Sequence, residues 1–149
     1  MKYHHTFRVR APLNAAVDFH ARASSLKAIT PPVIPMQLHR VPERIGDGDE
    51  MEFTMWMGPL PVRWVARVED VSSNGFLDRQ VRGPFGQWVH RHTFLKGDEG
   101  TTEVVDQVQA RLRRHLLWGP VGLGMWVGLP LLFAYRGWKT RRLLAGAAG

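Results

Sequence analysis

Residues 76–94 read FLDRQVRGPFGQWVHRHTF, and this stretch decides the expected fold. Two strand-like runs flank the turn signal at 83–86, so the stretch predicts an antiparallel hairpin with strands at 76–82 and 87–96. Successive strand residues point to opposite faces, which places Trp88, His90, His92 and Phe94 on the same face. One face of the expected sheet therefore carries two imidazoles between large aromatic rings.

Further strand signals lie on both sides of this hairpin. The sequence Ser72-Ser73-Asn74-Gly75 predicts a hairpin turn, and Gly97-Asp98-Glu99-Gly100 predicts another. Alternating apolar and polar residues predict strands at 3–9, 36–38, 51–57, 62–69 and 102–110. Within the run at 51–57, we expect the apolar residues at 51, 53, 55 and 57 to face inward.

Helix signals are confined to the two ends of this series of strands. Pro12 suits the first turn of a helix, and Ser24 or Ser25 is expected to cap a second short helix that ends at Pro31-Pro32. The residues after 111 are helix-like. The predicted order of elements is typical of an α+β fold: one strand, two short helices, about six antiparallel strands and a long C-terminal helix. A twisted sheet of this size curls, and the long helix is expected to cover its concave face.

The composition limits the possible classes of protein. With 149 residues, the chain is expected to form a single domain over residues 1–149. The absence of cysteine excludes disulfides, thiol nucleophiles and cysteine-ligated metal sites. The first ten residues contain no apolar run, so no signal peptide is expected and a cytoplasmic location is the default.

The net charge of +7 is confined to the end of the chain. Residues 1–110 hold 13 basic and 13 acidic side chains, whereas residues 111–149 hold seven basic side chains and no acidic one. A nucleic-acid-binding domain would spread basic residues over a folded face. Here they flank an uncharged stretch at 116–135, so we expect no nucleic-acid partner.

A set of motifs resembles a known superfamily. The motifs are Phe76-x-Asp78-x-Gln80-x-x-Gly83-Pro84-Phe85-x-x-Trp88-x-His90-x-His92-x-Phe94, with Trp64-x-Ala66 upstream and Asp106 downstream. Together with the element order, they resemble the helix-grip fold of the START and birch-pollen-allergen superfamily (SRPBCC), in its bacterial polyketide cyclase/dehydrase-like, ligand-binding branch. The resemblance implies a curved antiparallel sheet of about six to seven strands around a long C-terminal helix.

The resemblance also implies a function. Most relatives bind lipids, sterols, polyketides or other hydrophobic molecules between sheet and helix, and a minority are cyclases. The chain departs from the pattern near its end, where residues 117–122 read LWGPVG instead of a Pro-aromatic-Gly turn. It also places Pro130 inside the expected helix.

The family pattern suggests that Asp78 and Gln80 share the face of the histidines. The length of the turn at 83–86 then allows Gln80 to face His90 and Asp78 to face His92. The turn at 97–100 allows His92 to face Asp106. Directly opposed side chains lie about 4.5–5.5 Å apart at Cβ. We therefore expect His92 to lie between two carboxylates, which should raise its pKa against the effect of burial.

We call the set Asp78, Gln80, His90, His92 and Asp106 the polar row, and three interpretations of it compete. The first is a structural hydrogen-bond network that fixes the strand register. The second is a polar anchor for one end of a ligand in an apolar pocket. The third is chemistry, with His90 or His92 as a general base oriented by Asp78 or Asp106. Two histidines and a carboxylate also form a weak metal signal, and we assign no metal and no cofactor.

The favoured interpretation is a non-catalytic binding module for a hydrophobic small molecule or lipid. The alternative is a cyclase or dehydratase that uses the same polar row on a polyketide-like substrate, and the third is a peripheral membrane-associated protein. The expected ligand-binding residues are Met36, Phe53, Met55, Trp64, Asp78, Gln80, Trp88, His90, His92, Phe94, Asp106, Met125, Leu129 and Leu132.

The uncharged stretch at 116–135 supports two opposite predictions. Its 20 residues are about enough to span a bilayer. Three features favour a buried helix instead: several glycines and prolines, basic residues at both ends, and the need to cover the sheet. We also expect Pro130 to bend this helix, because proline lacks a backbone N–H donor. We expect residues 121, 125, 129 and 132 to pack on the sheet, leaving Trp126, Leu131 and Phe133 for a membrane surface or a homodimer.

Overall fold

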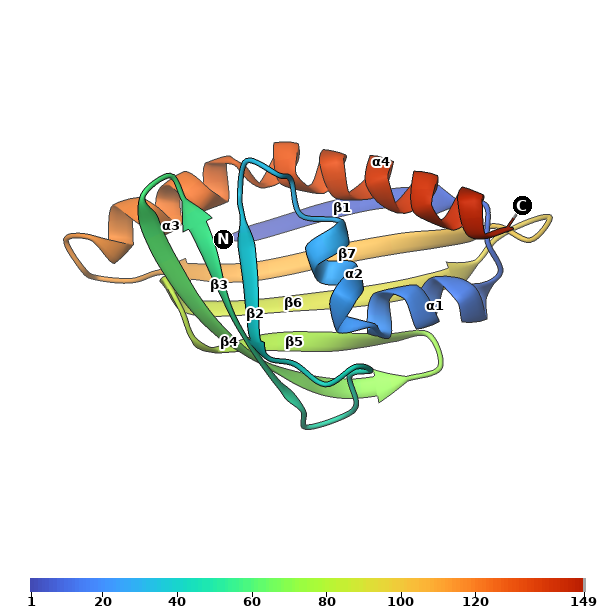
Figure 1. Ribbon diagram of the computed structural model, residues 1–149, viewed down its shortest axis with the longest axis horizontal. Helices are drawn as coiled ribbons and strands as arrows, with labels where there is room; N and C mark the ends of the chain where they lie inside the picture. Colours follow the sequence, from blue (N-terminus) through green and yellow to red (C-terminus); the bar gives the residue numbers. More distant parts are fainter. Residues whose placement is uncertain (149) are drawn as a thin grey trace.

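The computed structural model describes residues 1–148, with side chains up to residue 145. Its strands form a seven-stranded antiparallel sheet in the order β1-β7-β6-β5-β4-β3-β2 (Figure 1). Consecutive strands from β2 to β7 are neighbours, and β1 pairs with β7, so the expected meander is confirmed. The bounds are β1 Lys2–Val9, β2 Met36–Arg40, β3 Glu50–Met57, β4 Leu60–Ser72, β5 Gly75–Arg82, β6 Phe85–Lys96 and β7 Thr102–Leu112.

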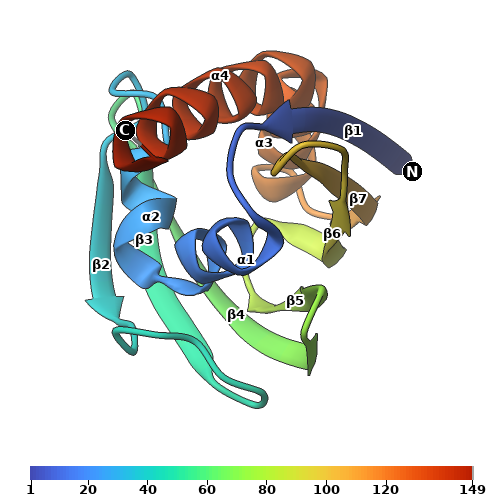
Figure 2. The same cartoon turned by 90° about the vertical axis from the view of Figure 1, so that its right-hand side faces the viewer.

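The helices lie on one side of the sheet. α1 (Leu13–Ala21) and α2 (Ala23–Ala28) follow β1, and α3 (Trp118–Val127) and α4 (Leu129–Ala148) follow β7. Figure 2 shows that the sheet curves, that α4 lies across its open side, and that α1 and α2 lie inside the curve. The expected α+β helix-grip architecture is therefore confirmed.

The expected serine cap of the second helix is wrong. α2 begins at Ala23 with Arg22 as its N-cap residue, and Ser24 and Ser25 lie inside its first turn. Arg22 is extended because it forms a β-bridge with Arg44, and the Ile45 N–H donates to Ala21 O at 2.8 Å. The start of α2 is therefore set by contacts with a distant loop, which outweigh the local preference for serine.

The long C-terminal helix is broken where proline was expected to bend it. α3 and α4 meet at Gly128 with an angle of 51° between them. Pro130 lacks a backbone N–H and becomes the second residue of α4, a position where a helix needs no such donor. In the described part of the chain no single helix is long and apolar enough to cross a membrane, and only the bent pair passes by length and composition.

The expected outward position of Phe133 is also wrong. Phe133 is 1% exposed, and its ring lies 5.4 Å from that of His90. The reason is helical periodicity: Phe133 follows Leu129 by four residues, so both occupy the face that points to the sheet. Leu131 is 80% exposed, as expected, while Trp126 is half-buried and contacts Tyr3 edge to face.

Candidate functional site

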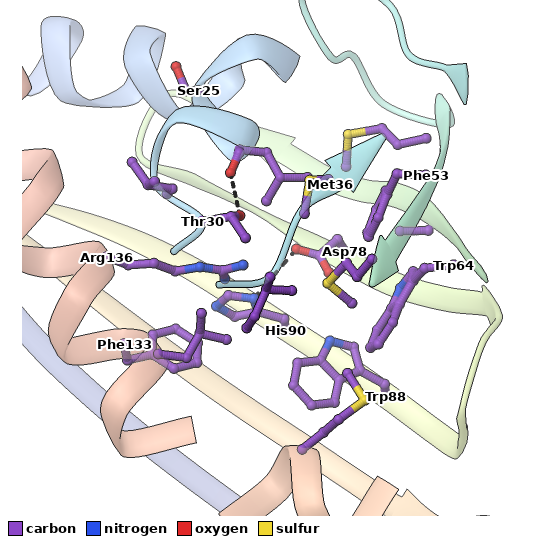
Figure 3. A pocket seen from close by; sticks show the side chains of 18 of the residues that line it. Ser25, Thr30, Met36, Phe53, Trp64, Asp78, Trp88, His90, Phe133 and Arg136 are labelled. Atoms are coloured by element: carbon purple, nitrogen blue, oxygen red, sulfur yellow. Dashed lines mark hydrogen bonds and ion pairs between the residues drawn. The ribbon is translucent and has the colours of Figure 1, made fainter. Parts of the chain in front are cut away.

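A cavity of about 200 Å³ lies between the concave face of the sheet and the helices. Large apolar side chains from β3, β4, β6 and α4 form its walls, and a group of polar side chains forms one end (Figure 3). Of the residues expected to bind a ligand, those lining this cavity are Met36, Phe53, Met55, Trp64, Asp78, Trp88, His90, His92, Met125, Leu129 and Leu132.

Three of the expected residues do not line the cavity. The side chain of Gln80 turns away and brackets the hairpin turn, with its amide donating to Phe85 O at 2.8 Å and accepting from Phe85 N at 3.1 Å. Phe94 is fully buried, with its ring 4.9 Å from that of His20. Asp106 is buried behind the histidines and reaches the cavity only through them.

The register of the central hairpin differs from the expectation by two residues. In the structure Asp78 faces His90, and Phe76 faces His92. The hydrogen bonds from Gln80 to Phe85 tighten the turn and take Gln80 out of the paired region, which accounts for the shift. A shift of two residues keeps every side chain on its original face, so the polar row survives. The pairing of His92 with Asp106 on β7 is confirmed.

His92 lies between two carboxylates, as expected. Its Nε2 donates to Asp78 Oδ2 at 2.8 Å, and its Nδ1 lies 3.1 Å from Asp106 Oδ1. Burial disfavours the charged imidazole, but Asp106 and Asp78 outweigh this effect and raise the pKa of His92 to about 9. At neutral pH His92 is therefore a cation that neutralises one of the two carboxylates.

His90, in contrast to His92, is held as a neutral imidazole. Its Nε2 donates to Asp106 Oδ1 at 2.9 Å, while its Nδ1 lies 3.7 Å from Asp78 Oδ2. Burial and the adjacent charge of His92 lower the pKa of His90. A neutral imidazole that donates through Nε2 has a free lone pair on Nδ1. The pair thus combines a protonated His92 with a neutral His90, and the ring centroids are 3.8 Å apart.

The sequence reasoning missed five polar residues that line the cavity: His20, Arg22, Ser25, Thr30 and Arg136. His20 on α1 donates from Nδ1 to Ala16 O at 2.8 Å, and burial lowers its pKa to about 4. Arg136 on α4 points toward His90 and Asp78 (Figure 3). Helical spacing could have found His20 and Arg136. Arg136 follows Leu129 by seven residues, and His20 follows the fully buried Ala16 by four.

The same cluster has the composition of a two-histidine, one-carboxylate metal site. Asp78, His90 and His92 each bring one potential ligand atom within 4.8 Å of the others. A cation there would displace the proton between His92 Nε2 and Asp78 and would have Arg136 as a positive neighbour. Asp106 would accept from the other nitrogen of His90, as carboxylates do behind metal-bound histidines.

Neither family models nor curated proteins match this chain, whereas many solved structures do. The protein TTHA0849 from Thermus thermophilus superposes with a TM-score of 0.77 at 14% identity, covering 100% of both chains. Norcoclaurine synthase from Thalictrum flavum gives 0.75 at 11% identity over 100% of this chain and 96% of that one. The Zhui aromatase/cyclase from Streptomyces gives 0.70 at 17% identity over 96% of this chain and 95% of that one.

These likenesses establish the fold. The chain has a helix-grip fold, and the structures with the same fold include aromatase/cyclase and synthase enzymes as well as Ara h 8.0201. A shared fold does not fix a shared reaction, so the chemistry of this chain depends on its own residues.

Proposed function

We propose that residues 1–149 form one domain that binds a hydrophobic small molecule between the sheet and α4. The observation that carries this proposal is the cavity, whose walls are mainly apolar and aromatic and into which a cluster of Asp78, His90 and Arg136 brings polar groups. Such a distribution is typical of ligand pockets, where a few polar groups orient an otherwise apolar molecule. The norcoclaurine synthase from Thalictrum flavum, whose structure is a complex with dopamine and hydroxybenzaldehyde, shows that a protein of this fold can bind small aromatic molecules.

The volume of the cavity limits the ligand. About 200 Å³ is less than the roughly 300–1,000 Å³ typical of pockets for drug-sized molecules. The walls include Phe53, Trp64, Phe85 and Trp88, whose rings pack against one another at centroid distances of 4.9–6.2 Å. These walls favour a compact molecule with an aromatic or short aliphatic body over a long lipid chain.

Titration with the neutral fluorophore 1-aminoanthracene tests this proposal. We expect saturable binding with a rise in fluorescence, and Trp88→Ala should change the affinity because Trp88 lines the cavity. Trp138→Ala is the matched control, since Trp138 is exposed on α4 and should not affect binding. Absence of saturable binding by the folded protein would contradict the proposal. Native mass spectrometry of the purified protein would then identify the class of any co-purified ligand.

A second candidate function is a cyclase or dehydratase. The observation that favours it is the neutral His90, whose Nδ1 lies at the polar end of the cavity while Asp106 holds its Nε2–H. This arrangement suits a general base, because the carboxylate fixes the tautomer and stabilises the imidazolium that forms. If the protein is such an enzyme, Asp106→Asn should abolish turnover and leave ligand binding largely intact, since Asp106 does not line the cavity. Equal turnover by the variant would reject this role.

The outer surface of α3 and α4 supports a third function, contact with an anionic membrane. Leu123 and Val127 lie four residues apart on α3, Leu131 follows on α4, and all three are exposed. The flanking charges are basic throughout residues 111–149. Apolar side chains among basic ones suit an anionic bilayer surface. We expect co-sedimentation with vesicles containing phosphatidylglycerol but not with pure phosphatidylcholine, and loss of it in Leu131→Glu. Dimerisation without vesicle binding would assign this surface to a second copy.

A further inference from the structure

The guanidinium of Arg136 enters the cavity from α4 without a protein partner. Its Nε is fully buried and has no hydrogen-bond acceptor. Among the described residues no carboxylate lies within 4.0 Å of it, although 11 other contacts between basic and acidic groups meet that limit. Its Cζ lies 5.6 Å from the centroid of the Phe133 ring, so the guanidinium stacks over an aromatic side chain.

An arginine in this position is costly unless something accepts its hydrogen bonds. Arginine has five N–H donors and stays protonated at neutral pH. A buried charge without a partner destabilises a fold, so buried arginines are normally paired. The neighbouring carboxylates are already engaged: Asp78 accepts from His92, and Asp106 accepts from His90. Arg136 is half-buried, its Nε has no acceptor, and its side chain lines the cavity, so its donors are free to bind a molecule there.

The position of Arg136 also fits the shape of the cavity. Figure 3 shows Arg136 and Phe133 on one side of the cavity and Phe53 and Trp64 on the opposite side, with Asp78 and His90 between them. A ligand whose ring lies against the tryptophans can therefore present a polar group to the guanidinium. A carboxylate matches the planar fork of an arginine with two parallel hydrogen bonds.

We propose that Arg136 binds the carboxylate of an amphipathic organic acid whose apolar body fills the aromatic end of the cavity. This inference rests on the proposed ligand-binding function and narrows it to a class of ligand. His20 also lines the cavity, and its Nε2 remains free as an acceptor because Nδ1 donates to Ala16 O. A hydroxyl on the same acid would find its acceptor there.

Calorimetric titration with matched ligands tests the inference. The ligands are 2-naphthoic acid, the neutral 2-naphthalenemethanol of nearly the same shape, and acetate, which has the carboxylate without the apolar body. We expect the wild-type protein to bind the acid at least about tenfold more tightly than the alcohol, because hydrogen bonds to charged groups are stronger than those between neutral groups. Acetate should bind far more weakly than the naphthoic acid.

Substitutions then assign this preference to one residue. Arg136→Met should remove the preference while affinity for the alcohol stays nearly unchanged, and Arg136→Lys should keep part of it. Arg142→Met is the matched control, because Arg142 is an exposed arginine on the same helix. Equal binding of acid and alcohol by the wild type, or a preference that survives Arg136→Met, would overturn the inference and leave the ligand-binding function standing. Failure of both naphthalene ligands to bind would overturn the ligand-binding function and the inference together.

Discussion

Asp106 joins two imidazoles through one carboxylate oxygen. His90 Nε2 lies 2.9 Å from its Oδ1, and His92 Nδ1 lies 3.1 Å from the same atom. One oxygen thus fixes the tautomer of a neutral histidine and stabilises a protonated one. Because Asp106 is buried and Asp78 lies on the other side of His92, the two rings are held in different charge states by a single network.

The charge states of the histidines give the first prediction. His92, with a pKa of about 9, should remain protonated at pH 8, whereas His20, with a pKa of about 4, should be neutral at pH 5.5. The Cε1–H proton shifts measured by NMR across about pH 4–10 report the midpoints. A His92 midpoint below that of an unfolded-peptide control, about 6.5, would contradict the carboxylate network.

The same shift makes stability depend on pH. The folded pKa of His92 is raised above the unfolded value, so its stabilising contribution is fully present below about pH 6.5 and is lost as pH rises through about 9. The free energy of unfolding from urea titrations should therefore fall by roughly 3 kcal/mol between about pH 6.5 and 10. His4→Gln, at an exposed position on β1, should leave this profile unchanged. A flat profile would show that His92 is not paired in the folded state.

The predictability of these residues depends on the element that carries them. Strand alternation within β6 fixes the sheet face of His90 and His92. The turn length leaves their partners on β5 uncertain by two residues, a shift that keeps every side chain on the same face. His20 and Arg136 lie on helices, whose rotation about their axes depends on packing. Arg136 follows Leu129 by seven residues, a spacing that places both on one helix face, but the prediction of the buried face ended at Leu132.

At the scale of elements, α4 has one buried face and one exposed face. Leu129, Phe133 and Leu144 are buried, whereas Leu131 is 80% exposed. Turn residues made the strands predictable, because each hairpin has a local signal. The bend near Pro130 was predicted from its missing donor, and the break falls at Gly128, which has low helix propensity. The error on Phe133 has another cause: its four-residue spacing from Leu129 places both on one helix face, which the prediction did not apply.

A matched pair of substitutions tests this assignment. Leu129→Ala should destabilise the protein by about 2 kcal/mol or more, because it removes a buried side chain and enlarges the cavity. Leu131→Ala should change stability by less than about 0.5 kcal/mol, as is usual for exposed positions. Urea unfolding followed by tryptophan fluorescence compares the two. Equal effects would mean that α4 is rotated from its position in the structure.

At the scale of the whole molecule, the sheet and the C-terminal helices depend on one another. α4 packs along β1 and contributes Leu129 and Phe133 to the space that the curved sheet encloses. Trp64 and Trp88 lie on the concave face and are 5% and 8% exposed. Trp64 and Trp88 stay buried only because α4 covers that face. The same cover keeps the ion pairs of the polar row away from water.

Deletion of residues 116–149 distinguishes two roles for α3 and α4: a cover that the sheet needs in order to fold, and a dispensable membrane anchor. Without α3 and α4, the tryptophans and the Asp–His network would face water. Each large side chain that loses its burial removes about 1.5–3 kcal/mol from a fold that is stable by only roughly 5–15 kcal/mol. We therefore expect the truncated chain to lose cooperative thermal unfolding by circular dichroism and to aggregate in size-exclusion chromatography. A dispensable membrane anchor predicts the opposite result: a folded, monodisperse fragment that still binds 1-aminoanthracene. That result would show that the sheet keeps its core without α4, and the cavity would have to be closed by α1 and α2 alone.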